Sequence, residues 1–473
     1  MKWQPWTVGV VLAACITGEA VQAEVKLNKL FSDAMVLQRD RANPIWGTGA
    51  ADEEIKISLG KTEVKAKADA QGMWQAELPA LTAGGPHELQ VAGSNTITVK
   101  DVLIGEVWLC SGQSNMAMMV ARSLNADTEK AAAEFPQIRM FTVPRNSQKE
   151  PQTELAGSWT VCSPQTVGNF SATAYFFGRE LHAALKVPVG LINSSVGGTP
   201  IEFWTSRQAH KAFVKSPAGA DVYPEKGAGS ELRDGASNLY NGMIAPLGQF
   251  GIRGAIWYQG ERNSRFNGQA YGGLLRTMIA DWRTRWNQPE MPFLFVQLPN
   301  YTAAQKAPVE TNGWVQVREG MLQTLKVPQT GMAVTLDVGD AKDIHPKNKQ
   351  AVGQRLARWA LGTTYQQEGE YSGPLYKSMK VSDGKILLEF SHIGQGLSTP
   401  DNQPLQGFAI AGEDKKFVNA HARIVGDSIE VSSPAVPKPV AVRYAWAPNP
   451  TFNLFNQDGL PASPFRTDDW KDE

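Results

Sequence analysis

The sequence predicts an α/β protein with a mostly parallel sheet covered by helices on both faces, flanked by two β-rich regions. In the middle of the chain, apolar strand-like runs alternate with helical patterns, which is typical of such a sheet. Towards both ends, short runs of alternating apolar and polar residues are separated by turns, which indicates antiparallel strands. The chain has 473 residues, more than one hydrophobic core usually supports, so several domains are expected.

Residues 1–23 have the features of a secretory signal. They combine a basic start, an apolar stretch over residues 8–16 and a small-residue end at residues 21–23. The apolar stretch is too short to span a bilayer. The same segment contains LAAC, which resembles a bacterial lipoprotein cleavage box ending at Cys15. We therefore expect a protein without a transmembrane segment that is exported to the periplasm or the exterior, either free or as a lipoprotein.

Residues 24–101 predict an N-terminal β-sandwich. The period-two runs are Ile55, Ile57 and Leu59, then Val64, Ala66 and Ala68, then Trp74, Ala76 and Leu78. Turn-forming residues such as those at 69–72 separate the runs, and this spacing is typical of short antiparallel strands.

Residues 102–364 predict the α/β domain. We expect strands at 102–110, 138–143, 189–193, 254–258, 293–297 and 332–336, with helices that include 171–185 and 271–286. In such sheets, ligands bind beyond the carboxyl ends of the strands. Residues 209–237 are rich in Gly, Ala, Lys and Pro and predict a long surface loop, and loops of that length often carry function, for example as a lid.

Residues 365–473 return to short alternating strands with many Pro and Gly, which predicts a C-terminal β-rich region. The pattern leaves open whether this region packs on the first β domain or on the α/β domain.

Charge and cysteine content narrow the function classes. The chain has 46 Lys and Arg against 46 Asp and Glu, so its formal net charge gives no reason to expect nucleic acid or an anionic membrane as partner. Once Cys15 is removed with the signal, Cys110 and Cys162 could pair, or each could remain a buried thiol. Because Cys and His show no zinc-ligand spacing, we expect no metal or other cofactor.

The segment VWLCSGQSNMAMM places Ser114 just after the first strand of the α/β domain. A serine there either caps a helix or acts as a nucleophile, and a nucleophilic serine needs a base, usually histidine. Six histidines are candidates. Three lie in the β regions (His87, His392 and His421), His182 lies within a predicted helix, and His210 lies in the long loop and stays open.

His345 is the preferred base because it follows the last predicted strand and therefore lies at the same sheet edge as Ser114. Asp343 is close enough in sequence to orient the imidazole, as the acid of a catalytic triad does. Alternatively, Asp343 and Asp340 serve only the turn before the next helix.

Ester hydrolysis also needs hydrogen-bond donors for the oxyanion, and two other strand ends could supply them. INSSVGGTPIEFW places Gly197 and Gly198 after a strand, and IWYQGERN offers the side-chain amides of Gln259 and Asn263. Glycines are also common in turns, and each amide could simply pair with backbone. Four strand ends that present such groups together indicate an active site more strongly than any one of them.

Four segments in this order closely resemble the sialate O-acetylesterase family of the SGNH (GDSL-like) hydrolases. They are DVLIGEVWLCSGQSNM, SSVGGTPIEFWTS, WYQGERN and DIHPKNKQAVGQRLA. MVLQRDRANPIWG and LPASPFRTDDW also look like that family, so the resemblance covers nearly the whole mature chain.

The resemblance implies a three-layer α/β/α hydrolase that removes acetyl esters from sugars without a cofactor. It implies Ser114 as nucleophile, His345 as general base, and the N–H groups of Ser114 and of Gly197 or Gly198 as oxyanion donors. The broader superfamily usually adds an asparagine side chain, whereas this chain offers Gln259 first and Asn263 as a substitute. Its acid usually stands three residues before the histidine, whereas Asp343 stands two before, with Asp340 as fallback.

The substrate is open at this stage. Trp204, Tyr258 and Phe266 could face a sugar, although each fits the core at least as well. An O-acetylated sialic acid would require a cation for its carboxylate, and the candidates are Arg262, Arg265 and Arg466. An acetylated plant polysaccharide such as xylan or xyloglucan needs none. A catalytically inactive carbohydrate-binding protein, and a lipase or thioesterase, are alternatives of other classes.

Overall fold

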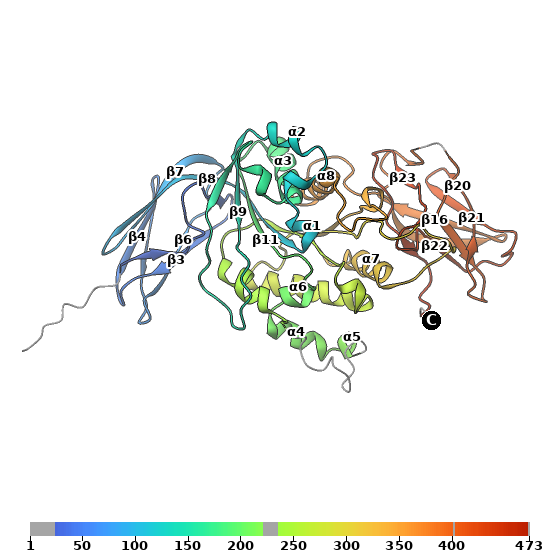
Figure 1. The fold of residues 1–473 in the computed structure, drawn as a ribbon, viewed down its shortest axis with the longest axis horizontal. Coiled ribbons are helices and arrows are strands. Elements are labelled where there is room, and N and C mark those ends of the chain that lie inside the picture. The colour runs from blue at the N-terminus through green and yellow to red at the C-terminus, as the bar shows by residue number, and fades with distance from the viewer. Residues whose placement is uncertain (1–23, 221–234, 401–402, 472–473) are drawn as a thin grey trace, which may run out of the picture.

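The computed structural model describes residues 24–220, 235–400 and 403–471. The predicted signal segment, with Cys15, lies outside these residues. Figure 1 shows an α/β part in the middle, with the N-terminal strands on one side and the C-terminal strands on the other. Within the described residues, no helix is long and apolar enough to cross a membrane.

The central sheet has the strand order β10-β9-β11-β8-β12-β13-β14. All neighbouring pairs are parallel except β9 and β10, so the predicted mostly parallel sheet is confirmed, with one antiparallel edge strand that the sequence did not indicate. The strands are β8 (Thr96–Gly112), β9 (Phe135–Thr142), β10 (Trp159–Cys162), β11 (Val189–Ser195), β12 (Gly254–Tyr258), β13 (Phe293–Val296) and β14 (Thr330–Ala333).

Helices cover both faces of this sheet, as predicted. Along β12, Ile256 and Tyr258 pack with α3 and α8, whereas Ala255 and Trp257 face the core beneath α6 and α7. Successive side chains of a strand point to opposite faces, so a strand covered on both sides is apolar at every position. The helices are α1 (Ser114–Ala117), α2 (Ala126–Ala131), α3 (Ala172–Leu185), α4 (Arg207–Val214), α5 (Pro217–Ala220), α6 (Tyr271–Arg285), α7 (Gly313–Thr324) and α8 (Lys349–Trp359).

Strand β8 joins the N-terminal strands to the central sheet. Its first half pairs with β7 and β2, and its second half pairs with β11 and β12. Its side chains are exposed or half-buried at several positions up to Val102 and fully buried from there to Gly112, which is where the sequence changes its period. The predicted boundary at 101/102 therefore falls inside one continuous strand.

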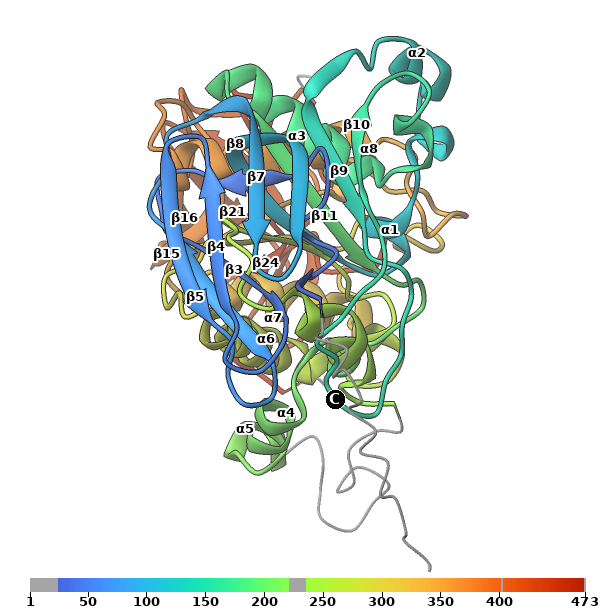
Figure 2. The ribbon, with the colours of Figure 1, turned by 90° about the vertical axis from the view of Figure 1, so that its left-hand side faces the viewer.

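The other N-terminal strands form a small three-stranded sheet and the outer part of the large sheet. Figure 2, seen from that end, shows β4, β5 and β7 in front of the α/β layers. The strands are β1 (Lys26–Leu27), β2 (Val36–Gln38), β3 (Asn43–Thr48), β4 (Glu54–Leu59), β5 (Thr62–Lys67), β6 (Met73–Leu78) and β7 (Gly84–Ala92).

The C-terminal strands pack against the α/β part, which the sequence left undecided. Arg318 on α7 is 1% exposed and donates hydrogen bonds to the carbonyl oxygens of Ala447 and Pro448. The strands are β15 (Leu375–Ser382), β16 (Lys385–Ser391), β17 (Leu397–Ser398), β18 (Phe408–Ala411), β19 (Val418–Asn419), β20 (His421–Val425), β21 (Ser428–Ser432), β22 (Ala441–Tyr444), β23 (Phe455–Asn456) and β24 (Phe465–Arg466).

Two local predictions are resolved by the described residues. The expectation of a continuous loop over 209–237 is wrong in its first part, because residues 207–214 form α4, capped by the Ser206 hydroxyl, which accepts the N–H of Ala209. Residues 221–234 lie outside the described residues. Cys110 and Cys162 are both buried free thiols, so they do not form a disulfide.

Candidate active site

The candidate site lies where β8, β11 and β12 end side by side. Gly112, the last residue of β8, is in register with Ser195 of β11 and Tyr258 of β12. A side chain at Gly112 would be 2.2 Å from the Tyr258 carbonyl oxygen, so only glycine allows this close approach. The segments that follow these strands therefore leave the sheet at one edge, as the sequence predicts.

Ser114 and His345 meet at this edge. Ser114 is the first residue of α1, and its Oγ lies 2.8 Å from Nε2 of His345, which comes from the loop after β14. Burial lowers the pKa of His345 below its usual value of 6.5, and the nearby Lys349 and Arg122 lower it further, against the opposing effect of Asp343. A neutral imidazole can accept the hydroxyl proton, so this pair has the geometry of a nucleophile and its general base.

Asp343 is the acid that contacts His345. Its Oδ1 lies 3.5 Å from Nδ1 of the imidazole and accepts the backbone N–H of His345 at 2.9 Å. Asp340 instead accepts the backbone N–H groups of Lys342 and Asp343, as in an Asx-turn. The turn interpretation therefore describes Asp340, whereas Asp343 both supports the turn and faces the imidazole.

Backbone N–H groups surround Ser114. A side chain at Gly197 would be 3.3 Å from the Ser114 Cβ, so this glycine lies against the serine. Gly198 has a φ of +74°, a left-handed conformation that favours glycine. Within the described part of the chain, the N–H groups of Ser114, Gly197 and Gly198 have no hydrogen-bond acceptor. They are available to a developing oxyanion.

The side-chain donors expected from Gln259 and Asn263 are engaged elsewhere. Nε2 of Gln259 lies within 3.2 Å of three acceptors, on Asn263, Thr199 and Gln113. Nδ2 of Asn263 donates to Glu202 and to Asn267. Both amides are fully buried. The expectation that one of them points at the oxyanion is therefore wrong for this structure, because a buried amide bonds to the nearest protein acceptors.

Two of the predicted sugar-facing aromatics are wrong. Trp204 and Tyr258 are both 0% exposed, and the Trp204 indole N–H donates to the Thr199 hydroxyl within the core. Phe266 is 55% exposed, and the Arg262 guanidinium lies 4.6 Å from its ring centroid. The Arg262 backbone N–H donates to the Gln113 side chain, which keeps this pair next to Ser114.

The other histidines and arginines considered from the sequence lie apart from the serine. His210 is on α4 and 1% exposed, and Nδ1 of His182 lies 2.8 Å from the Val187 carbonyl oxygen. Arg466 is on β24 and forms an ion pair with Glu319. Arg122, which the sequence analysis missed, is exposed and near enough to affect the pKa of His345.

The sequence analysis also missed three buried polar residues under the site, Asn115, Glu261 and Lys349, none more than 2% exposed. Asn115 follows Ser114, and Glu261 lies within the WYQGERN segment. A signal for Lys349 was present, since α8 buries positions 349, 352, 353 and 356, a helical spacing in which a lysine occupies a core position.

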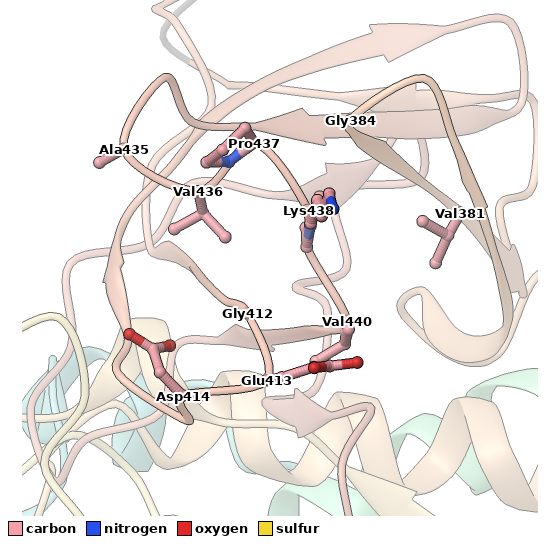
Figure 3. A pocket seen from close by; sticks show the side chains of 11 residues that line it. Val381, Gly384, Gly412, Glu413, Asp414, Ala435, Val436, Pro437, Lys438 and Val440 are labelled. Carbon is pink, nitrogen blue, oxygen red and sulfur yellow. The ribbon is translucent and has the colours of Figure 1, made fainter.

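A separate cleft of about 590 Å³ lies in the C-terminal β-rich region (Figure 3). It is lined by turns of two sheets, with Glu413, Asp414 and Lys438 as its charged side chains. Its lining contains no serine or histidine, so the described residues give it no equivalent of the Ser114 and His345 pair.

Comparisons with known proteins agree with this geometry. Residues 104–362 match the family described as "Carbohydrate esterase, sialic acid-specific acetylesterase". The chain is 30% identical to the rat sialate O-acetylesterase, with 98% of each chain covered, and 31% identical to the human one, with 92% of this chain and 91% of that one covered. A crystal structure of a carbohydrate acetylesterase from Xanthomonas citri superimposes with a TM-score of 0.86 at 40% identity, covering 94% of this chain and all of the other.

Proposed function

The chain belongs to the sialic acid-specific acetylesterase family of carbohydrate esterases, and we propose that Ser114, His345 and Asp343 carry out its reaction through an acetyl-enzyme. The protein is a carbohydrate O-acetylesterase and so a carboxylic-ester hydrolase. The observation that carries the residue assignment is the 2.8 Å contact between Ser114 Oγ and His345 Nε2, at the edge where the parallel strands end.

In the first half of the reaction, His345 takes the Ser114 proton as Oγ attacks the acetyl carbonyl carbon. The oxyanion accepts hydrogen bonds from the N–H groups of Ser114, Gly197 and Gly198, which lie free around the serine. The bond from the acetyl carbon to the sugar oxygen then breaks, and that oxygen takes the proton from His345. Asp343 keeps the second imidazole proton on Nδ1, which it faces.

In the second half, a water molecule gives its proton to His345 and attacks the acetyl carbon. The bond to Ser114 Oγ breaks as the serine recovers the proton, and acetate leaves. These steps need only that His345 be neutral when each half begins, which its lowered pKa favours at neutral pH.

For the substrate we propose an acetylated sugar that carries a carboxylate, of the sialic acid type. Two cations support this choice. Arg122 is exposed and acts on the charge of His345, and Arg262 is held beside Gln113 with its guanidinium over the exposed Phe266 ring. Arginine recognises carboxylates by paired hydrogen bonds, and Phe266 offers a surface for a sugar ring.

The test measures acetate release from an O-acetylated sialoglycan and from an acetylated xylan, side by side, with wild type and Ser114→Ala. We expect release from the sialoglycan only, and none with the variant. Release from xylan alone would overturn the substrate proposal, and full activity of a folded Ser114→Ala would overturn the residue assignment. Absence of acetate from both, and from a chromogenic acetyl ester, would support the binding-protein alternative.

We also propose that the protein is exported to the periplasm or the exterior. The support is the signal-like composition of residues 1–23, and Cys15 makes a lipid anchor the alternative. The N-terminal residue of the protein purified from its host distinguishes the two, because a lipoprotein would begin at a modified Cys15.

A further inference from the structure

A chain of buried polar groups runs directly beneath the Ser114 and His345 pair. Lys349 Nζ donates to Asn115 Oδ1 at 2.5 Å. The Asn115 Nδ2 donates to Glu261 Oε1 at 2.5 Å and to the Ile344 carbonyl oxygen at 3.0 Å. Asn115 is the neighbour of Ser114, and Ile344 is the neighbour of His345. The two segments that meet at the serine hydroxyl are thus joined a second time, one residue away on each side.

The orientation of the Asn115 amide follows from its neighbours. An ammonium group only donates hydrogen bonds and an ionised carboxylate only accepts them, so Lys349 selects the amide oxygen and Glu261 selects the amide nitrogen. That orientation directs an N–H at the Ile344 carbonyl. If Lys349 did not hold the oxygen, the amide would lose the charged partner that keeps its N–H groups on the other side.

Such a buried pair of charges is not expected to stabilise the fold by itself. Lys349 is 0% exposed and Glu261 2% exposed, and an amide separates their charged groups. Removing two charges from water costs free energy that their attraction often fails to recover, so buried ion pairs are weak evidence for a role in stability. The site where both residues converge is next to the reacting groups.

We propose that Lys349 is a positioning residue for the hydrolysis, which holds Asn115 so that the Ser114 turn and the His345 loop stay at reacting distance. This inference rests on the proposed function of Ser114 and His345. Lys349 touches neither reacting group in the structure and acts through Asn115, with Glu261 as the charged group that fixes the opposite end of the amide.

The charge of Lys349 also acts on His345. Burial lowers the pKa of Lys349 to about 7, and the groups that face it are Glu261, Asp343 and the Tyr258 ring, which lies 5.0 Å away. The groups that act on His345 are Asp343, Lys349 and Arg122. At acidic pH, Lys349 is cationic and disfavours the imidazolium. Without Lys349, the pKa of His345 rises and less neutral base is present in that range.

The test is Lys349→Met, with Lys347→Met as matched control, since Lys347 is an exposed lysine two residues earlier. For Lys349→Met we expect kcat to fall about 10²-fold, with KM for a chromogenic acetyl ester unchanged, because misplaced groups lose rate rather than affinity. The acid limb of kcat/KM should also move to higher pH. Lys347→Met should keep the wild-type kcat. A role in folding alone would lower the amount of folded protein without moving this limb.

Asn115→Leu and the double variant test the route. If Lys349 acts through Asn115, the double variant should lose no more kcat than the worse single variant, whereas independent roles would multiply the losses. If Lys349→Met does not fold, Asn115→Leu alone should show the same loss of kcat with KM kept. Wild-type kcat and pH profile in a folded Lys349→Met, with Ser114→Ala inactive, would overturn the positioning role and leave the proposed function intact. An active Ser114→Ala would remove the proposed function itself.

Discussion

Asp343 meets His345 twice, once at the imidazole and once at the backbone. Its Oδ1 lies 3.5 Å from Nδ1 and accepts the His345 N–H at 2.9 Å. The backbone bond fixes where the carboxylate sits relative to the ring, even though the Asp343 side chain is 48% exposed. An acid two residues before the histidine can thus orient it without the longer spacing that is usual in the superfamily.

Asp343→Asn should lower kcat about 10²-fold, because the amide no longer selects the tautomer with the proton on Nδ1. The Asp343 charge raises the pKa of His345, so the acid limb of kcat/KM should move to lower pH in the variant. Asp340→Asn is the control and should retain kcat, since Asp340 bonds only to the turn. Equal losses in both variants would return Asp343 to a turn role.

The wild-type acid limb should lie below pH 6.5. Activity requires neutral His345, and burial lowers its pKa from that value. Arg122→Gln removes a positive charge that lowers this pKa, so its limb should move to higher pH. The profile is measured as kcat/KM on a neutral chromogenic ester, so that loss of a contact to a sugar carboxylate does not enter. A shift to lower pH would contradict the assignment of His345 as the base.

Gly197→Ala should reduce kcat with little change in the folded state. The added Cβ would be 3.3 Å from the Ser114 Cβ, which forces the donor strip and the serine apart. Loss of one oxyanion donor typically costs about 10²- to 10³-fold in kcat. Circular dichroism and thermal unfolding check that the variant is folded, and a kcat near wild type would remove Gly197 from the oxyanion site.

Gln259→Leu should act mainly on stability. The buried Gln259 side chain accepts the Tyr271 hydroxyl and donates to Asn263, so the variant leaves buried polar groups unpaired, at about 1–3 kcal/mol in the free energy of unfolding. The kcat of the folded variant should fall less than that of Gly197→Ala. A larger loss of kcat at unchanged stability would restore Gln259 as an oxyanion donor.

Trp204→Ala and Phe266→Ala should separate core from surface. Trp204 is fully buried against Trp257, so its loss should cost about 3–5 kcal/mol in the free energy of unfolding. Phe266 is 55% exposed, so Phe266→Ala should leave stability unchanged and raise KM for the glycan. Unchanged KM for both a small ester and the glycan would exclude Phe266 from the sugar surface.

The sequence by itself determined the layers and the residues that meet. Apolar runs that are buried on both faces identify parallel strands, and β12 was predicted with its exact bounds of 254–258. Because parallel strands end at one edge, order along the chain was enough to bring Ser114 and His345 together. These features depend on local periodicity and on a simple rule of topology, which is why they can be read without coordinates.

Only the tertiary structure decided which polar and aromatic side chains face the site. Gln259 and Trp204 follow strands as active-site residues do, but their partners, Asn263 and Thr199, come from packing between segments far apart in the fold or in register only after folding. The link from Lys349 to Asn115 joins residues 234 positions apart. Burial and hydrogen-bond direction are properties of the assembled neighbourhood, and no local pattern in the sequence specifies them.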